Sequence, residues 1–325
     1  MKNFSVDTGG KVMKVESKNK LSEVKIRDVS LRDGLQLTGG MLSTESKVAL
    51  VRALLANGVD EIELGSMARP DLVPPLANSL EVVEQLEPEE LVKCWIWVAT
   101  PKHVVRAAAA GARNFQYCFS VSDSHNKANI GRTTEGSLDA LPEAVKYCEE
   151  VGGRIQLCLA TSFTCPFEGA ISEERVIEIV SDERTAGTCD VVVCDTIGQA
   201  TPNQVSRLVS RVGEAANGRR IVYHGHDTWG LGVANAVAAV KSGASVVDGA
   251  LGGLGGCPFA PGASGNTATE DLLYALRPSW LTTVSFQQLV REGERLVAEL
   301  GEENQSRAAK GAFASPESYP WSVKL

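Results

Sequence analysis

Short, almost continuously apolar runs recur along the chain, separated by segments with a helical pattern. The runs lie at 24–31, 61–66, 94–100, 115–122, 154–161, 190–196, 220–227 and 245–251. Continuous apolar character is typical of parallel strands covered on both faces, because half-exposed strands alternate apolar and polar residues. We therefore predict eight buried parallel strands.

Helix-start signals stand between these runs. Ser43 precedes an amphipathic segment that ends at Gly58, and further segments begin at Pro101 and at Thr201-Pro202. Serine caps a first turn, proline is tolerated within it, and glycine ends a helix well. Eight strand–helix units predict a (β/α)8 TIM barrel, an α/β fold. An open doubly wound sheet is the alternative, disfavoured because no G-x-G-x-x-G follows an early strand.

The same pattern divides the chain into three parts. Residues 1–22 are polar and form a flexible N-terminal lead-in, and 23–283 form the catalytic barrel. Residues 284–325 form a C-terminal helical extension and tail, with further helix expected within 285–310.

Composition narrows the class of protein. A charged fraction of 22% and a hydrophobic fraction of 43% describe an ordinary globular protein. The net charge of −8 and the lack of a basic stripe exclude nucleic acid as the main partner. The polar N-terminus and the absence of a long apolar run predict neither signal peptide nor membrane span. The eight cysteines lack zinc-knuckle spacing, which indicates reduced thiols and a cytoplasmic protein.

Candidate chemistry gathers where the predicted strands end, which is where a TIM barrel holds its active site. Polar side chains stand at the ends of strands one, two, six and seven and in the loop after strand eight. They are Arg32, Asp33, Glu63, Asp195, His224, His226, Cys257 and Asn266.

Two of these residues suggest a metal centre. His224 and His226 are two positions apart on a strand, so their side chains share a face. With Asp33 and Asn266 at neighbouring strand ends, the donor set suits Mg²⁺ or Mn²⁺, with Zn²⁺ behind because no thiolate is included. The alternative is a pair of satisfied core histidines.

Three of the remaining candidates have two interpretations each. Arg32 either stabilises a developing oxyanion or only pairs with Asp33. Glu63 and Asp195 are either active-site acids or structural acids of the barrel rim. Cys257 lies in a glycine-rich loop where nothing requires burial, so its thiol can act as an acid or base.

Five motifs carry a family resemblance: RDVSLRDGLQ (27–36), CPFEG (165–169), CDTIGQATP (194–202), HGHDTWG (224–230) and GLGGCPFAPGASGNTATEDLLY (253–274). Together they resemble 3-hydroxy-3-methylglutaryl-CoA lyases over about 22–300. The resemblance implies a TIM barrel that uses Mg²⁺ or Mn²⁺ and cleaves an acyl-CoA into acetoacetate and acetyl-CoA, a step of leucine degradation. It also implies a homodimer.

The resemblance also assigns roles by motif. It implies that Arg32 stabilises the enolate oxygen, that Glu63 and Asp195 orient substrate and move protons, and that Cys257 helps to transfer a proton. His224 and Asp195 are both candidates to accept the hydroxyl proton. The implied metal ligands are Asp33, His224, His226 and Asn266, and the further substrate-binding residues are Gln36 and Ser66.

Two departures from the family pattern leave the acyl group open. Leu37-Thr38-Gly39-Gly40 stands where these lyases usually have Asn-Glu-Lys, and Gly65-Ser66-Met67 stands in place of Thr-Ser-Phe. One rival is therefore a lyase for citramalyl-CoA or a longer branched glutaryl-CoA. A second is a condensing transferase related to isopropylmalate synthases, disfavoured by Leu35 and Asp227. A third is a barrel that binds without catalysis.

Overall fold

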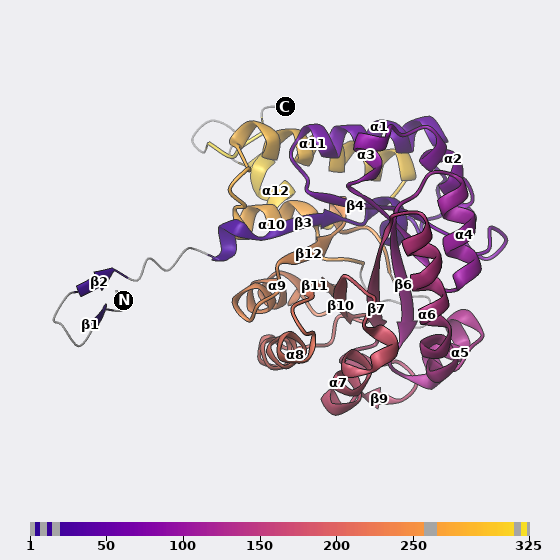
Figure 1. Cartoon of the computed structure of the whole chain (residues 1–325). Coiled ribbons are helices and arrows are strands. Elements are labelled where there is room, and N and C mark those ends of the chain that lie inside the picture. The colour runs from indigo at the N-terminus through magenta and orange to yellow at the C-terminus, as the bar shows by residue number, and fades with distance from the viewer. Residues whose placement is uncertain (1–3, 7–11, 15–19, 257–264, 315–319, 324–325) are drawn as a thin grey trace.

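The computed structural model describes residues 4–6, 12–14, 20–256, 265–314 and 320–323. Within these residues, eight parallel strands close into a barrel, which confirms the predicted TIM barrel and excludes the open sheet (Figure 1). In spatial order the strands are β10 (Asp190–Asp195), β11 (Arg220–Gly225), β12 (Val246–Gly249), β3 (Lys25–Asp28), β4 (Glu61–Ser66), β5 (Cys94–Val98), β6 (Asn114–Ser120) and β7 (Arg154–Ala160).

Helices surround the barrel and connect its strands. They are α1 (Thr44–Ala56), α2 (Ser79–Glu84), α3 (Pro88–Leu91), α4 (Pro101–Ala109), α5 (Asp123–Ile130), α6 (Thr134–Glu150), α7 (Glu173–Ser181), α8 (Pro202–Ala215), α9 (Gly232–Lys241), α10 (Thr269–Leu276), α11 (Thr283–Leu300) and α12 (Arg307–Ala314). Short turns are η1 (Lys20–Glu23), η2 (Ser30–Gly34), η3 (Pro74–Leu76), η4 (Glu183–Thr185) and η5 (Leu251–Gly253). Short strands β8 (Thr164–Cys165) and β9 (Gly169–Ala170) form a separate hairpin.

The barrel strands are apolar throughout because each has two covered faces. In β10, Val191 and Val193 pack in the core between strands and helices, whereas Val192 points into the barrel interior. Most strands are shorter than predicted, the first and the last by the most. The first ends at Asp28 because the chain enters η2, and the last ends at Gly249 just before η5.

The predicted helix starts are confirmed at the level of individual caps. The Ser46 backbone N–H donates to Ser43 Oγ at 3.1 Å, and Thr201 forms a capping box with Gln204 at the start of α8. Such caps satisfy N–H groups that have no partner within the helix.

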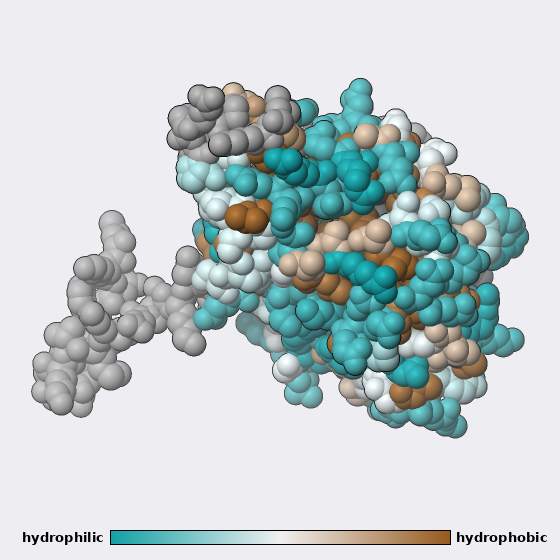
Figure 2. Space-filling model, turned by 90° about the horizontal axis from the view of Figure 1, so that it is seen from above, coloured by the Kyte–Doolittle hydropathy of each residue, from teal (hydrophilic) through white to brown (hydrophobic). Residues whose placement is uncertain are grey.

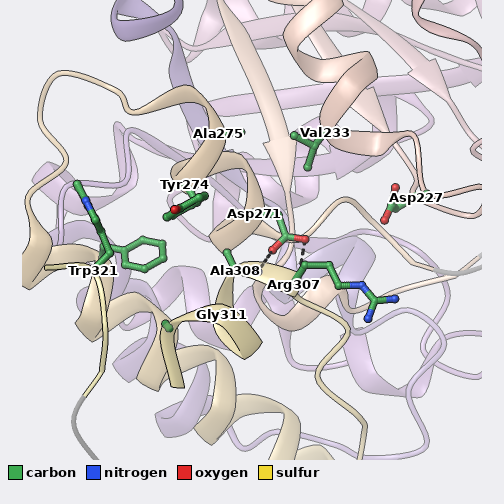
Figure 3. Close-up of a pocket in the computed structure, with 12 residues that line it drawn as sticks. Asp227, Val233, Asp271, Tyr274, Ala275, Arg307, Ala308, Gly311 and Trp321 are labelled. Atoms are coloured by element: carbon green, nitrogen blue, oxygen red, sulfur yellow. Dashed lines mark hydrogen bonds between the residues drawn. The ribbon is translucent and has the colours of Figure 1, made fainter. Parts of the chain in front are cut away.

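The C-terminal extension covers one side of the barrel. The helix expected within 285–310 is present but divided, because α11 ends at Leu300, before Gly301 with φ +70°, and α12 begins at Arg307. α11 contacts both α1 and α10, so an early and a late helix of the chain lie side by side (Figure 1). The Asp271 carboxylate accepts hydrogen bonds from the backbone N–H groups of Arg307 and Ala308 at 3.2 and 2.6 Å, which fastens α12 to α10 (Figure 3).

A cavity of about 400 Å³ lies where this extension meets the barrel, lined by aromatic, small and charged side chains (Figure 3). On the face that carries α1 and α11, hydrophilic residues predominate, with apolar patches scattered among them (Figure 2). Among the described helices, none has the length and apolarity needed to cross a bilayer. Before the barrel, β1 (Phe4–Val6) and β2 (Val12–Lys14) pair antiparallel.

Candidate active site

A cavity of about 660 Å³ opens at the C-terminal ends of the barrel strands. Most of the predicted site residues that the structure describes line it: Arg32, Asp33, Gln36, Ser66, His224 and His226. The fold therefore brings together side chains that are separated by up to about 190 positions in sequence, as the His226–Asp33 contact shows. Cys257 lies outside the described residues.

A π-helical turn, η2, presents Arg32 and Asp33 to this cavity. The Gly34 backbone N–H donates to the carbonyl of Val29 at 3.0 Å, which closes the wide turn. Ser30 Oγ anchors the turn by accepting from the Leu251 N–H at 2.7 Å. Such turns are rare and frequently occur at functional sites, because they re-aim consecutive side chains.

Asp33 is the centre of a compact group of possible metal ligands. Its Oδ2 lies 3.1 Å from His226 Nε2 and 3.8 Å from His224 Nε2, and it accepts from Asn266 Nδ2 at 3.0 Å. Ligand atoms of Asp33, His224 and His226 all lie within 4.8 Å of one another. The predicted pair of histidines thus converges on one carboxylate.

The group fits a divalent cation by an independent criterion. Asn266 Oδ1 is buried and makes no hydrogen bond to any described residue, although the same amide contacts Asp33 through Nδ2. Buried polar atoms are rarely left without a partner, so each such atom needs an explanation. A carboxylate, two imidazoles and an amide oxygen are a donor set that Mg²⁺ or Mn²⁺ accepts.

The glycine-rich segment after β12 places Asn266. His226 and Asn266 form an isolated β-bridge, and the Asn266 N–H donates to the Leu254 carbonyl at 3.2 Å. Gly255 adopts φ +118°, and a Cβ there would lie only 2.6 Å from Asn266 Nδ2. Only glycine allows the chain to pass this close to the amide.

Asp248 and Arg27 stand behind His224, and sequence reasoning did not single them out. Asp248 Oδ2 lies 3.0 Å from His224 Nδ1, and Arg27 contacts the same carboxylate through Nε at 2.8 Å and Nη2 at 2.6 Å. Burial raises the pKa of Asp248, but the charge of Arg27 and the bond to His224 lower it overall. This carboxylate fixes the ring so that Nε2 faces Asp33. The sequence did contain a signal for both residues, because Arg27 and Asp248 are charged residues within the predicted apolar strands 24–31 and 245–251.

Arg32 connects the metal group to Glu63. Its Nη1 contacts Asp33 Oδ1, its Nε lies 3.8 Å from Glu63 Oε1, and its guanidinium lies 5.4 Å from the centre of the Trp97 ring. Gln116 Nε2 donates to Glu63 Oε1 at 2.5 Å. Burial raises the pKa of Glu63, although the charge of Arg32 opposes this. Arg32 thus makes the ion pair with Asp33 and still lines the cavity.

Asp195 is placed differently from the other predicted residues. Its carboxylate accepts from the backbone N–H groups of Gln199 and Ala200, both at 3.0 Å, and is not part of the cavity lining. Burial raises its pKa, and these hydrogen bonds oppose that effect. Thr196, the next residue, lines the cavity instead. Asp195 thus holds the loop after β10, and its catalytic role stays a prediction.

A neighbouring part of the cavity lining is small and apolar. We call Ala99, Cys118, Cys158, Ala160 and Cys194 the thiol wall, and Arg32, Asp33, His224, His226 and Asn266 the polar half. All members of the thiol wall are buried in one cluster inside the barrel and line the same cavity. The described cysteines are free thiols, as predicted. The sequence alone suggested no function for this wall.

The barrel, the cavity and the Asp-His-His group define the class of protein: a TIM-barrel enzyme with a site suited to a divalent metal. Residues 23–296 match the family described as HMGL-like, and the chain belongs to this family. It is therefore a lyase of the 3-hydroxy-3-methylglutaryl-CoA lyase type, as the motifs indicated.

Three relatives show how the family varies. A Pseudomonas aeruginosa 3-hydroxy-3-isohexenylglutaryl-CoA/hydroxymethylglutaryl-CoA lyase is 32% identical and covers 90% of this chain and 98% of its own. A Chloroflexus aurantiacus (R)-citramalyl-CoA lyase is 34% identical, covering 86% and 92%. The structure of an Acinetobacter baumannii HMG-CoA lyase with coenzyme A and 3-methylmalate has a TM-score of 0.84 and 35% identity, covering 91% and 97%. These identities are so similar that they do not fix the substrate.

Proposed function

We propose that this protein is a divalent-metal-dependent lyase that cleaves 3-hydroxy-3-methylglutaryl-CoA into acetoacetate and acetyl-CoA. The observation that carries the proposal is the convergence of Asp33, His224 and His226 beside Arg32 in one cavity. Family membership supports the type of reaction. The proposed cofactor is Mg²⁺ or Mn²⁺, held by Asp33, His224, His226 and Asn266.

The reaction requires a tertiary alcohol to lose its proton while a carbon–carbon bond breaks and a thioester enolate leaves. When bound, the divalent ion lowers the pKa of the substrate hydroxyl and fixes its orientation. Arg32 is placed to donate hydrogen bonds to the enolate oxygen as negative charge develops there. A preorganised donor of this kind is worth about 3–4 kcal/mol in the transition state.

The arrangement around His224 limits how protons can move. Its Nδ1 is engaged by Asp248, so Nε2 is the nitrogen that is available to the cavity. The Asp195 carboxylate is occupied by backbone amides. Nε2 is thus the His224 nitrogen that would hold the metal, and His224 and Asp195 both stay proposals for the group that accepts the hydroxyl proton. Glu63 lies close enough to Arg32 to set the direction of its guanidinium. The role of Cys257 in proton transfer stays a proposal based on the sequence.

The outer part of the cavity suits a coenzyme A thioester. Arg69, His103 and Lys127 line it and bring positive or polar groups to the rim, where phosphate groups of the substrate can bind. Gln36 and Ser66 also line it and are proposed to contact the acyl group. A homodimer in the cytoplasm is proposed from the family resemblance, and sedimentation of the purified protein would test the dimer.

The direct test is to incubate the purified protein with Mg²⁺ and 3-hydroxy-3-methylglutaryl-CoA and to measure acetoacetate and acetyl-CoA. We expect both products in equal amounts, and we expect chelation of the metal to abolish them. Arg32→Met should lower kcat by about 10²–10³-fold, because the donor to the enolate oxygen is lost. Arg207→Met, on α8 with its side chain 57% exposed, is the matched control.

A related lyase activity is the second candidate, favoured by the 34% identity to the citramalyl-CoA lyase. If the protein cleaves citramalyl-CoA to pyruvate and acetyl-CoA but does not cleave 3-hydroxy-3-methylglutaryl-CoA, the second candidate replaces the first. Condensation of acetyl-CoA with a 2-keto acid would refute both.

A further inference from the structure

We propose that the thiol wall binds an apolar branch at C3 of the substrate, so that this protein accepts 3-hydroxyacyl-CoA thioesters whose branch is longer than a methyl group. The inference rests on the proposed function, since it names the class of substrate for the same site. It makes the residues of β6, β7 and β10 the determinants of specificity.

The thiol wall is a continuous surface next to the polar half. Cys118 is the register partner of Cys158 across β6 and β7, and Cys194 is the register partner of His224 across β10 and β11. The sulfur atoms of Cys158 and Cys194 are 3.5 Å apart. A molecule bound at His224 is therefore adjacent to the wall.

The wall is neutral as well as small. Its members carry only a thiol or a methyl group, and the contact with Cys158 together with burial raises the pKa of Cys118 well above its ordinary value. The thiol therefore stays protonated near neutral pH, and a buried thiol behaves as a small hydrophobe. This surface offers an oxyanion neither a charge nor a strong donor.

The chemistry of C3 decides which group meets the wall. This carbon carries a hydroxyl, a carboxymethyl arm, a thioester arm and one branch. The first three contain oxygen atoms that need the cationic and donor groups of the polar half. An apolar branch directed there would remove water from buried charges without replacing it, which is unfavourable. The branch is thus left to the thiol wall.

The room on that side is set by small residues at consecutive inward-facing positions. Ala160 is the strand neighbour of Ser120, and Cys118 and Cys158 face each other one step further into the barrel. Ala99 adds a methyl group from the end of β5. A cavity of about 660 Å³ is within the usual range for binding a whole ligand.

The test uses 3-alkylglutaryl-CoA thioesters with methyl, ethyl, propyl and butyl branches. They lack the 3-hydroxyl and cannot be cleaved, so their dissociation constants report binding alone when measured by calorimetry on the metal-loaded protein. Each methylene buried against the wall should tighten binding about threefold to fourfold. The matching 3-hydroxy compounds should show a parallel rise in kcat/KM.

Two variants change the room in opposite directions. Cys158→Met adds two heavy atoms to the wall and should lower the affinity ratio of the butyl to the methyl compound by about tenfold or more. Cys118→Ala enlarges the space and should shift the best branch to a longer one. Cys189→Met is the matched control, because Cys189 lies before β10, outside the cavity lining, and should leave the ratio unchanged.

The outcomes separate this inference from the proposed function. If 3-hydroxy-3-methylglutaryl-CoA is cleaved but the affinity for the 3-alkylglutaryl-CoA series is flat or falls as the branch grows, the wall is not an alkyl site and the lyase assignment stands. If no 3-hydroxy thioester in the series is cleaved, the proposed function itself fails. An unchanged butyl-to-methyl ratio in Cys158→Met, with the variant folded, overturns the assignment of the wall.

Discussion

The polar half and the thiol wall of the cavity are held together by different kinds of contact. In the polar half, each described side chain is held by another charged or polar group, as Asp33 is by Arg32, His226 and Asn266. In the thiol wall, the side chains are small, buried and neutral. The comparison suggests a division of work, in which one side fixes the reaction and the other selects the acyl group.

The difference also determines how each side responds to substitution. Removing one member of the polar half leaves its partners buried without compensation, and effects of such coupled residues are not additive. A substitution in the thiol wall changes mainly volume, which costs less and depends on how the surroundings relax. The following changes test this contrast, beginning with the largest effect expected.

Asp33→Ala should have the largest effect. Burial raises the pKa of Asp33, but the charge of Arg32 and the hydrogen bond with His226 lower it well below its ordinary value, so the group is an anion at neutral pH. Its loss removes the carboxylate from the Asp-His-His group and leaves Arg32 with Glu63 as its remaining acidic neighbour. We expect kcat/KM to fall by about 10³-fold or more, measured with saturating Mn²⁺.

Calorimetric titration with Mn²⁺ should show weaker binding in the same variant. Asp139→Ala provides the control, because that carboxylate lies on the surface of α6 with its side chain 65% exposed. Full activity in Asp33→Ala would contradict the ligand assignment.

Asp248→Asn tests whether the polar half extends one layer deeper. The amide preserves the shape but no longer neutralises Arg27, which is fully buried. We expect Mn²⁺ affinity to fall by about 10- to 100-fold, the usual effect of losing a group that orients a metal-binding histidine. Calorimetry measures this directly. A Mn²⁺ affinity equal to that of the wild type would show that metal binding by His224 does not depend on the Asp248 carboxylate.

Sequence reasoning recovered the polar half better than the wall because the two leave different traces. His224 and His226 share a strand face by spacing alone, and Asp33 follows a strand whose end belongs to the active-site face. The eight strands were predictable for a similar reason, since continuous apolar runs require two covered faces. The early ends of β3 and β12 were not predictable, because they depend on the turns η2 and η5.

The thiol wall had no such trace. Cys118, Cys158 and Cys194 each lie in an apolar run, where a buried cysteine is indistinguishable from any other core residue. Whether a side chain points into the barrel or toward a helix depends on the register of the closed sheet. Asp195 shows the converse, because the sequence marks a carboxylate at a strand end, but only the structure shows that the Gln199 and Ala200 amides hold it.

Glu270→Gln tests how a buried carboxyl group outside the cavity makes the stability of the protein depend on pH. Both carboxylate oxygens of Glu270 lie 3.0 Å from the Gly252 backbone nitrogen, and burial raises the pKa of this group to about 8. Between pH 4.5 and 8 the unfolded chain releases this proton and the folded protein keeps it, so stability falls as the pH rises. We expect Glu270 to contribute a loss of about 2 kcal/mol between pH 6 and pH 8.

The glutamine variant keeps an acceptor for Gly252 and removes the titration. Urea unfolding at pH 6 and pH 8 should therefore show a smaller loss in the variant, which should be the more stable protein at pH 8. An identical pH dependence in both proteins would mean that Glu270 does not titrate in this range.

Cys194→Ser is expected to have the smallest effect, and it tests the contrast most directly. Cys194 is the register partner of His224 but belongs to the thiol wall, so it lies on the border between the two sides. The hydroxyl is more polar than the thiol and finds only Cys158 nearby, so the free energy of unfolding should fall by about 1 kcal/mol in urea titrations. Mn²⁺ affinity should stay within about twofold of the wild type, because no ligand or charge is removed. A loss of affinity as large as that in Asp248→Asn would show that the wall and the metal group are one coupled unit.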